Sequence, residues 1–411
     1  MGINKGGKMR KLCLLILIVL CQLGYASVFL NTARIAYYNE RDFERAKKAC
    51  LEGIEKGELN FELHAILGGC EIGFGNWKDA SNALIRAFAI DSLKTIKWIG
   101  DRGGGEQYYF QAFYFAAREL FDEEKYEEAL NNLGYAKLLN PGDIGTYILT
   151  GAIQYKLGNI EQANREYKKA LNIDPENPDV HFLIGKSLFE TKEFDGSLTF
   201  FGDATKYYKL KYSRISKIVF QNLQVIEKTL AQKIIKLWIE QKIDELDQLI
   251  KVELELDGGL NAQQKNIEQF FKATDDLSRG YYFTGMAYYY LKKDSIALNY
   301  LLKSLELKPN DVDALYFAGE MHIKLKKYDD AIRYFEKVTL FKSDDIFAWF
   351  YLGICYTQLK EYKKAIDIYE NKVLQLNPEN IDAMTNLAYI YSEIGNSEKA
   401  LEYLRKVEQL Q

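Results

Sequence analysis

The segment that decides the fold spans residues 352–378 and reads LGICYTQLKEYKKAIDIYENKVLQLNP. Its first small residue is Gly353, and an aromatic residue, Tyr356, follows three positions later on the same helical face. A second small residue, Ala365, comes nine positions after that tyrosine, and Pro378 closes the segment. Proline cannot continue a helix. The segment therefore predicts two helices that form a hairpin and end at the proline.

The same pattern recurs along the chain at a nearly constant interval. In the C-terminal half the first small residues are 34, 34 and 35 positions apart, at Gly285, Gly319, Gly353 and Ala388. In the N-terminal half the interval of 34 separates Ala117, Gly151 and Gly185, which are answered by Ala129, Ala163 and Ser197 in the second helix. Weaker copies are marked by Gly68 with Ala80, and by Ala46 with Tyr37. We count nine copies.

Small residues at these positions have a physical reason. Where two helices cross, Gly, Ala or Ser lets the backbones approach, and a larger side chain would overpack the contact at a cost of about 1–3 kcal/mol. One hairpin cannot cover its apolar face alone, so neighbouring hairpins must stack into an array.

At these residues the chain resembles the tetratricopeptide repeat family. The resemblance implies an all-α fold, a right-handed α-solenoid of stacked helix-turn-helix repeats. It covers about three quarters of the chain and is specific for the fold, but one scaffold of this kind hosts many unrelated functions.

The first 26 residues have the features of a targeting segment. A basic stretch ends in Arg10-Lys11, the apolar run 12–20 follows, and small residues lie near Ala26. We expect cleavage after Ala26 and export to the periplasm or cell envelope of a bacterium. Lipid attachment at Cys21 and retention as an uncleaved membrane anchor stay open as alternatives.

The register breaks at two places. The first surplus holds residues 92–99, expected to add helical turns, and the glycine-rich joint 101–105. The second break separates Ser197 from Ala297 by 100 residues, where two degenerate hairpins could be hidden. We therefore expect an N-terminal array at 27–205, a divergent helical segment at 206–277 and a C-terminal array at 278–411.

The divergent segment opens with a basic stretch. It runs from Lys206 to Lys217, contains Lys209, Lys211 and Arg214, and carries no acidic residue. It is either a helix face with solvated lysines or a docking patch for an anionic partner. The net charge of −4 and the expected export argue against nucleic acid as the partner.

Nothing in the sequence indicates an enzyme, a cofactor or a metal site. The three histidines, His64, His181 and His322, fall in columns expected to be packed. Cys50, Cys70 and Cys355 are too few and too scattered for a disulfide framework. We expect buried thiols, with a Cys50–Cys70 disulfide as the alternative.

If the hairpins stack as the resemblance implies, their first helices line a concave groove that binds a partner protein. The predicted lining is apolar and aromatic, as interaction surfaces often are. It consists of Tyr114, Phe115, Arg118, Ile148, Phe182 and Lys186 in the first array, and of Tyr282, Met286, Tyr289, Tyr316, Phe350 and Ile354 in the second. Alternatively, several of these rings pack against the adjacent hairpin.

The sequence thus favours a non-enzymatic scaffold that binds other proteins in the bacterial cell envelope. One alternative is a self-associating structural protein that stacks through its last helix, where Leu404, Val407 and Leu410 lack a following helix. The other is a non-catalytic subunit of an envelope enzyme complex.

Overall fold

Every described element of the chain is a helix. The computed structural model describes residues 27–102, 105–220, 233–234, 237, 243–252 and 259–411, and no strand occurs in these ranges. The chain divides into two compact units, residues 1–174 and 175–411, and each is described by itself. The prediction of an all-α fold of stacked hairpins is confirmed.

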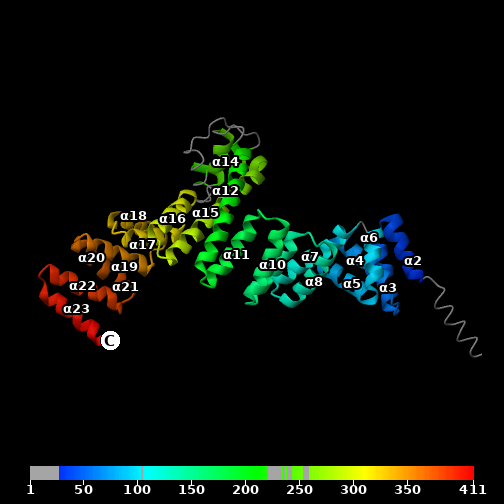
Figure 1. Ribbon diagram of the computed structural model, residues 1–411, viewed down its shortest axis with the longest axis horizontal. Coiled ribbons are helices and arrows are strands. Elements are labelled where there is room, and N and C mark those ends of the chain that lie inside the picture. The colour runs from blue at the N-terminus through cyan, green and yellow to red at the C-terminus, as the bar shows by residue number, and fades with distance from the viewer. Residues whose placement is uncertain (1–26, 103–104, 221–232, 235–236, 238–242, 253–258) are drawn as a thin grey trace, which may run out of the picture. The chain divides into compact units, whose positions relative to one another are not determined.

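In its described residues, unit 1 holds four hairpins and one additional helix (Figure 1). The hairpins are α2–η1 with α3, α4 with α5, α7 with α8, and α9 with α10, and the additional helix is α6. Their bounds are α2 Val28–Arg34, η1 Ile35–Glu40, α3 Phe43–Glu55, α4 Phe61–Phe74, α5 Trp77–Ile90, α6 Ser92–Arg102, α7 Glu106–Asp122, α8 Tyr126–Leu139, α9 Ile144–Lys156 and α10 Ile160–Ile173.

Unit 2 holds five hairpins in the residues that the structure describes. They are α11 with α12, α15 with α16, α17 with α18, α19 with α20–η2–α21, and α22 with α23, and α14 lies outside them. The bounds are α11 Pro178–Glu190, α12 Phe194–Phe220, α14 Ile243–Val252, α15 Gly259–Tyr290, α16 Asp294–Leu307, α17 Val312–Lys324, α18 Tyr328–Phe341, α19 Ile346–Gln358, α20 Tyr362–Ile368, η2 Tyr369–Val373, α21 Leu374–Leu376, α22 Ile381–Glu393 and α23 Ser397–Leu410.

Small residues lie at the helix crossings as the repeat pattern predicts. A β-carbon built on Gly185 would lie 2.7 Å from the ring of Phe201, and one on Gly319 would lie 2.8 Å from the ring of Phe335. Both distances are shorter than real carbon contacts. Each glycine therefore makes room for an aromatic ring of the second helix, and the two helices pack closely.

The interval of 35 residues in the C-terminal half has a structural cause. The second helix of its hairpin contains the π-helix η2 and, from Tyr362 to Leu376, is 15 residues long. The corresponding helix α18 has 14 residues and is α-helical throughout. A π-turn takes up one additional residue inside a helix. The insertion is therefore absorbed within the helix and does not lengthen the loop.

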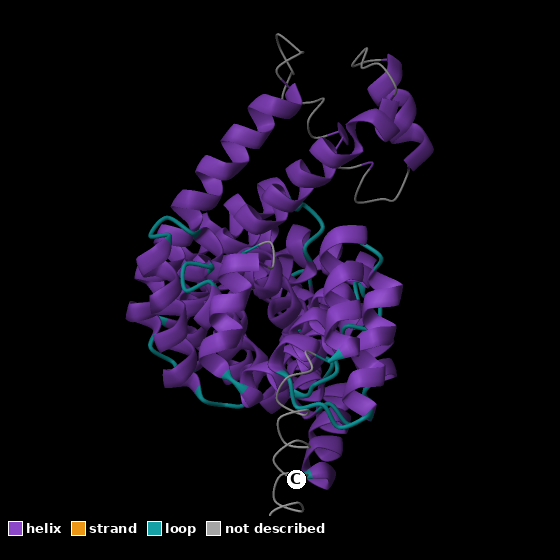
Figure 2. Ribbon diagram, turned by 90° about the vertical axis from the view of Figure 1, so that its right-hand side faces the viewer, coloured by secondary structure: helices purple, strands orange, loops and turns teal. Residues whose placement is uncertain are grey.

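Two long helices replace the regular pattern in the middle of unit 2. They are α12, with 27 residues, and α15, with 32, and they extend away from the stacked hairpins in Figure 2. The two pack directly on each other: a β-carbon on Gly280 would lie 2.8 Å from the Thr205 hydroxyl oxygen. The C-terminal half of α15 is therefore the first helix of the hairpin that follows α12.

The middle segment leaves the hypothesis of two hidden repeats open. Between α12 and α15 the structure describes only residues 233–234 and 237 and helix α14, so this hypothesis stays a prediction. The predicted segment boundaries at 205/206 and 277/278 fall inside α12 and α15, and no backbone break marks them.

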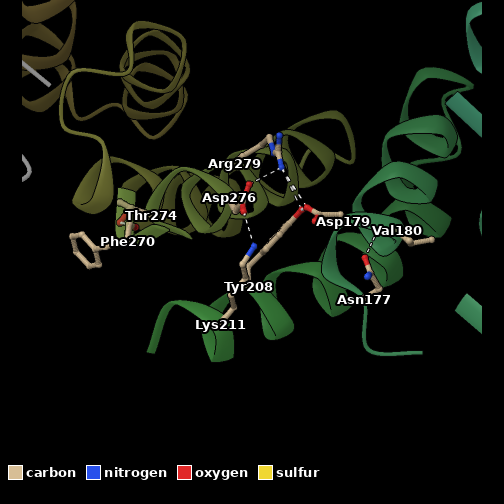
Figure 3. A network of polar contacts seen from close by, with 9 residues as sticks. All are labelled: Asn177, Asp179, Val180, Tyr208, Lys211, Phe270, Thr274, Asp276 and Arg279. Atoms are coloured by element: carbon tan, nitrogen blue, oxygen red, sulfur yellow. Dashed lines mark hydrogen bonds and ion pairs between the residues drawn. The ribbon is translucent and has the colours of Figure 1, made fainter. Parts of the chain in front are cut away.

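Polar contacts fasten α11, α12 and α15 to one another at this junction (Figure 3). The Tyr208 hydroxyl donates a hydrogen bond of 2.7 Å to Asp179. The nearly buried carboxylate of Asp276 accepts hydrogen bonds from Arg279 at 3.0 Å and from Lys211 at 3.2 Å. Because each charge at the junction has a partner, the network holds the long helices in one register.

The cysteines are packed thiols. Cys50, Cys70 and Cys355 are buried and free, so the alternative of a Cys50–Cys70 disulfide is wrong for this structure. Burial raises the pKa of Cys70 and of Cys355 to about 12, which disfavours the reactive thiolate. Within the described helices, none is long and apolar enough to cross a membrane.

Candidate functional site

The first helices of unit 2 carry a row of partly exposed aromatic rings. Tyr289 of α15 lies 5.4 Å, between ring centroids, from Phe317 of α17. The next step along the row joins Tyr316 of α17 to Tyr351 of α19 at 5.7 Å. Each ring thus packs on the neighbouring hairpin while part of it still faces solvent. The sequence left two alternatives for these rings, packing against the adjacent hairpin or lining an exposed groove. In the structure the same side chains do both.

The remaining predicted residues of the second array have different surroundings. Tyr282, Phe350 and Ile354 are half-buried on first helices, as a groove lining requires. Phe350 packs on Tyr369 at 5.8 Å. Met286, in contrast, is only 5% exposed, so its prediction as a surface residue is wrong. Whether the exposed members bind a partner stays a prediction.

Two predicted residues lie on α11, the first helix of the hairpin that precedes α15. Phe182 is 6% exposed and packs on Phe283 of α15 at 5.2 Å. The guanidinium of Arg279 covers its ring at 4.5 Å. Phe182 is therefore a core residue, and its prediction as lining is wrong because Phe283 and Arg279 of the following hairpin cover its ring. Lys186 is half-buried, with Glu190 3.8 Å away.

Three strongly exposed aromatic residues of the first helices were not among the predicted lining. Tyr290, Phe347 and Tyr389 have exposed fractions of 48%, 64% and 52%. Tyr389 directly follows the small residue Ala388, which is the position that Ile354 has relative to Gly353. The repeat register alone could therefore have identified Tyr389.

A charged pair lies among these rings. The Tyr289 hydroxyl donates a hydrogen bond of 2.9 Å to Glu320, and the Lys324 ammonium lies 4.1 Å from the centre of the Tyr289 ring. Lys324 is also 3.3 Å from Glu320. Burial, with Glu320 next in importance, raises the pKa of Tyr289 well above its ordinary value. The phenol therefore stays protonated and acts as a donor at neutral pH.

In unit 1 the predicted lining residues belong to α7 and α9. Phe115 packs on Trp77, at the start of the second helix α5, with centroids 4.8 Å apart. Tyr114 lies against α9, where a β-carbon on Gly145 would be 2.9 Å from its hydroxyl oxygen. Arg118 is exposed and Ile148 is half-buried. Tyr114 and Phe115 thus both contact a neighbouring hairpin and stay partly exposed, as Ile148 does.

The additional helix α6 covers the first helices of the preceding hairpins. Its Trp98 is 5% exposed and lies 5.5 Å from Tyr109 of α7 and 6.5 Å from Tyr38 of η1. Beneath it, the hydroxyls of Tyr37 and Tyr109 are 3.2 Å apart. The prediction of helical turns at 92–99 is confirmed, and these side chains fill the face of the first three hairpins.

The histidines are packed. His322 stacks on Tyr334 at 5.1 Å, and burial lowers its pKa. The Nε2 atom of His181 lies 2.8 Å from the Pro175 carbonyl oxygen, and burial also lowers the pKa of His64. No group of three or more His, Cys, Asp or Glu side chains in the described ranges is arranged to hold a metal ion. In the described structure His181 and His322 therefore serve helix packing.

Comparison with known families identifies the repeat. Four segments match models described as TPR or tetratricopeptide repeat, at residues 151–192, 284–345, 347–371 and 370–402. A comparison with curated protein sequences finds no significant match.

The chain is also similar to solved structures of repeat proteins. One is MamA from Desulfovibrio magneticus RS-1, with 25% identity over 36% of this chain and 91% of that chain and a TM-score of 0.31. Another is PilF of Pseudomonas aeruginosa, with 14% identity over 74% of this chain and 93% of that chain and a TM-score of 0.38. A third is YrrB, described as a TPR protein with an unusual peptide-binding site, with 17% identity, coverage of 68% and 92%, and a TM-score of 0.34.

Proposed function

Because the chain is a tetratricopeptide repeat protein, we propose that it is a non-enzymatic scaffold that binds a partner protein along the first helices of unit 2. The observation that carries this proposal is the exposure of aromatic side chains on the first helices of unit 2, beside the row of Tyr289, Phe317, Tyr316 and Tyr351. Tyr290 on α15, Phe347 on α19 and Tyr389 on α22 expose 48%, 64% and 52% of their surface. Aromatic side chains exposed in this way favour protein contact over solvation.

The chemistry of the row favours an amphipathic helix of the partner as ligand. Rings on successive first helices would receive apolar side chains at positions i, i+3 and i+7 of such a helix. Glu320 and Lys324 lie among the rings and would meet a polar residue of the partner. The surface offered by Tyr114, Arg118 and Ile148 in unit 1 is a smaller site of the same kind.

The cell envelope of a bacterium is part of the same proposal. Its support is the sequence of residues 1–26, which lie outside the residues that the structure describes. Cell fractionation and N-terminal sequencing of the purified protein test it directly. A mature chain that begins at Ser27 would support export with cleavage, whereas a cytoplasmic chain that begins at Met1 would exclude it.

Site-specific photocrosslinking tests the binding surface. A benzophenone amino acid at Phe347 or Tyr389 should yield the same crosslinked partner in living cells. Leu340 on the second helix α18 is 77% exposed and serves as the matched control position. Equal crosslinking from Leu340 would exclude a specific lining. A hydrolase or transferase as the captured protein would favour the alternative of a non-catalytic subunit in an envelope enzyme complex.

Self-association through α23 is the second candidate. Leu401, Leu404 and Leu410 expose 53%, 45% and 38% of their surface on this last helix. Val407, expected to be free, is 9% exposed and packs within its own hairpin. Light scattering of the wild-type chain and of Leu404→Glu decides this candidate. A strict monomer at high concentration would eliminate it, and a dimer lost in the variant would support it.

A further inference from the structure

The C-terminal half of α12 exposes one basic face. Residues 206, 209, 210, 213, 214 and 217 are exposed, whereas 204, 205 and 208 are buried. These two sets are the opposite faces of a single helix. The exposed set contains four cations and no acid, and we call these four, Lys206, Lys209, Arg214 and Lys217, the basic stripe.

The four charges are not compensated within the described structure. None of them forms an ion pair with another described residue, although the Lys206 ammonium lies 4.8 Å from the centre of the Tyr207 ring. Lys211 is different, because it turns inward and pairs with Asp276 at 3.2 Å. In this part of α12, one cation, Lys211, therefore pairs with α15, and the other four face solvent.

The stripe also has an apolar centre. Leu210 is 59% exposed and lies between Lys209 and Arg214 on the same face. From Lys206 to Lys217 the stripe is about 16 Å long at the rise of an α-helix. A row of cations around one exposed leucine is suited to a layer of anionic headgroups, where the cations meet phosphate and the leucine reaches the acyl boundary.

We propose that the basic stripe of α12 docks this protein on an anionic phospholipid bilayer. The four cations lie in one row along a single helix face, so they fit a broad charged surface. Regular second helices of this unit, such as α16 and α18, have 14 residues. The stripe begins thirteen residues into α12 and continues beyond that length, so it contacts a bilayer without using the aromatic row. The inference is therefore independent of the proposed partner site.

Vesicle binding tests the proposal on the full chain. Vesicles of phosphatidylcholine alone and with 30% phosphatidylglycerol are sedimented with the wild-type protein at low and at physiological ionic strength. Each cation near an anionic surface increases partitioning roughly five-fold. The variant with Lys206, Lys209, Arg214 and Lys217 all changed to Glu should therefore lose at least about a hundred-fold in partitioning to the anionic vesicles. Binding of the wild-type protein should also weaken as salt is added.

A matched variant separates the stripe from net charge. Lys168, Lys337, Lys363 and Arg405 are exposed, lie on four different helices and form no ion pair with a described residue. Changing these four to Glu alters the net charge equally and should preserve binding within about three-fold. Residues 1–26 carry four cations of their own, but they are identical in both variants. Circular dichroism shows whether each variant retains its helices.

Each remaining outcome overturns the proposal. The first is a wild-type chain that does not prefer anionic over neutral vesicles. The second is an equal loss of binding in both variants. The third is a wild-type chain that binds soluble polyglutamate but does not bind vesicles. If the stripe variant then loses the binding to polyglutamate, the partner of the stripe is an acidic protein and not a bilayer. If crosslinking from Phe347 persists in the stripe variant, failure here leaves the proposed scaffold function intact.

Discussion

The ring of Tyr369 lies directly against the backbone of Gly353, with no room for a side chain between them. A β-carbon on Gly353 would be 2.5 Å from Cε1 and Cζ of that ring. Tyr369 is fully buried, so the ring cannot turn into solvent to make space. This pair is a tighter form of the contact that repeats at Gly185 and Gly319.

Replacing Gly353 by Ala should therefore destabilise unit 2 by about 1–3 kcal/mol, through overpacking. Thermal and urea unfolding followed by circular dichroism measure the change. Gly134 is the control, because it lies within α8 and a β-carbon there would have no neighbour within 4 Å. Gly134→Ala should stabilise unit 1 by about 0.5–1 kcal/mol, because alanine has a higher helix propensity than glycine. Equal changes in the free energy of unfolding at Gly353 and Gly134 would contradict overpacking at the helix crossing as the cause.

The turn between paired helices gives a second prediction. Gly158 and Gly395 adopt positive φ in this turn, whereas in the hairpin of α17 and α18 the same position is Lys326, at φ 59°. Side chains other than glycine are disfavoured there. Lys326→Gly should therefore stabilise unit 2 by about 0.5–1 kcal/mol.

The neighbouring residue provides the control for this turn. Lys327 has a φ of −96° and precedes the first residue of α18. Lys327→Gly gains nothing from a relaxed φ and should be neutral or destabilising. A Lys326→Gly variant that unfolds at lower urea concentration than the wild type would refute the argument.

A buried carboxylate predicts a pH dependence. The side chain of Glu166 is 5% exposed and pairs with Lys137 and Lys169, each at 2.7 Å. Burial works to raise its pKa, but hydrogen bonds from the two lysines outweigh this effect, and the pKa is lower than its ordinary value of 4.5. The unfolded chain therefore binds more protons in acid, so the contribution is present above about pH 4.5 and is lost as the pH falls.

Glu166→Gln should consequently lower the stability of unit 1 by about 1–2 kcal/mol at pH 7, because both lysines are partly exposed. The difference from the wild type should shrink as the pH is lowered from 5 to 3. Unfolding curves at these pH values measure it, with the exposed Glu52→Gln as control. A difference that stays constant with pH would rule out the ion pairs as its origin.

The additional helix α6 gives the fourth prediction. Trp98 is buried, but its indole N–H has no hydrogen-bond partner among the described residues. Trp98→Phe keeps an aromatic ring between Tyr38 and Tyr109 and removes the unpaired donor, so it should change stability by less than about 1 kcal/mol. Trp98→Ala should cost about 3–5 kcal/mol. Similar losses in the two variants would contradict the argument that an aromatic ring of any kind is enough at this position.

The positions of the small residues could be predicted from the sequence because the same close helix contact recurs in each hairpin. Gly185, Gly319 and Gly353 each need the same clearance from a ring one helix away, so the interval between them carries the information. The helical hairpins that contain these glycines followed from that interval. The π-helix did not, since an interval of 35 does not say where the extra residue is placed.

Which residues of the first helices are exposed was harder to predict, because this depends on the neighbouring hairpin that packs on them. Phe182 and Met286 occupy lining columns, yet both are buried, and the ring of Phe182 is covered by Phe283 and Arg279 of α15. The pairing of Arg279 with Asp276 joins residues only three apart, but its contact with Phe182 joins segments about 100 residues apart. No repeat interval reports such a contact.

The extra residue in η2 has a consequence for the end of the chain. Glu370 lies in this widened turn, and its Oε1 atom accepts hydrogen bonds from Tyr391 at 2.8 Å and from Tyr403 at 2.9 Å. Deleting one residue between 369 and 373 would restore an ordinary α-turn and rotate the carboxylate by about 100° around the helix. Both phenols would then lose their shared acceptor. The one additional residue that interrupts the repeat interval thus places Glu370 where it binds both tyrosines of the terminal hairpin.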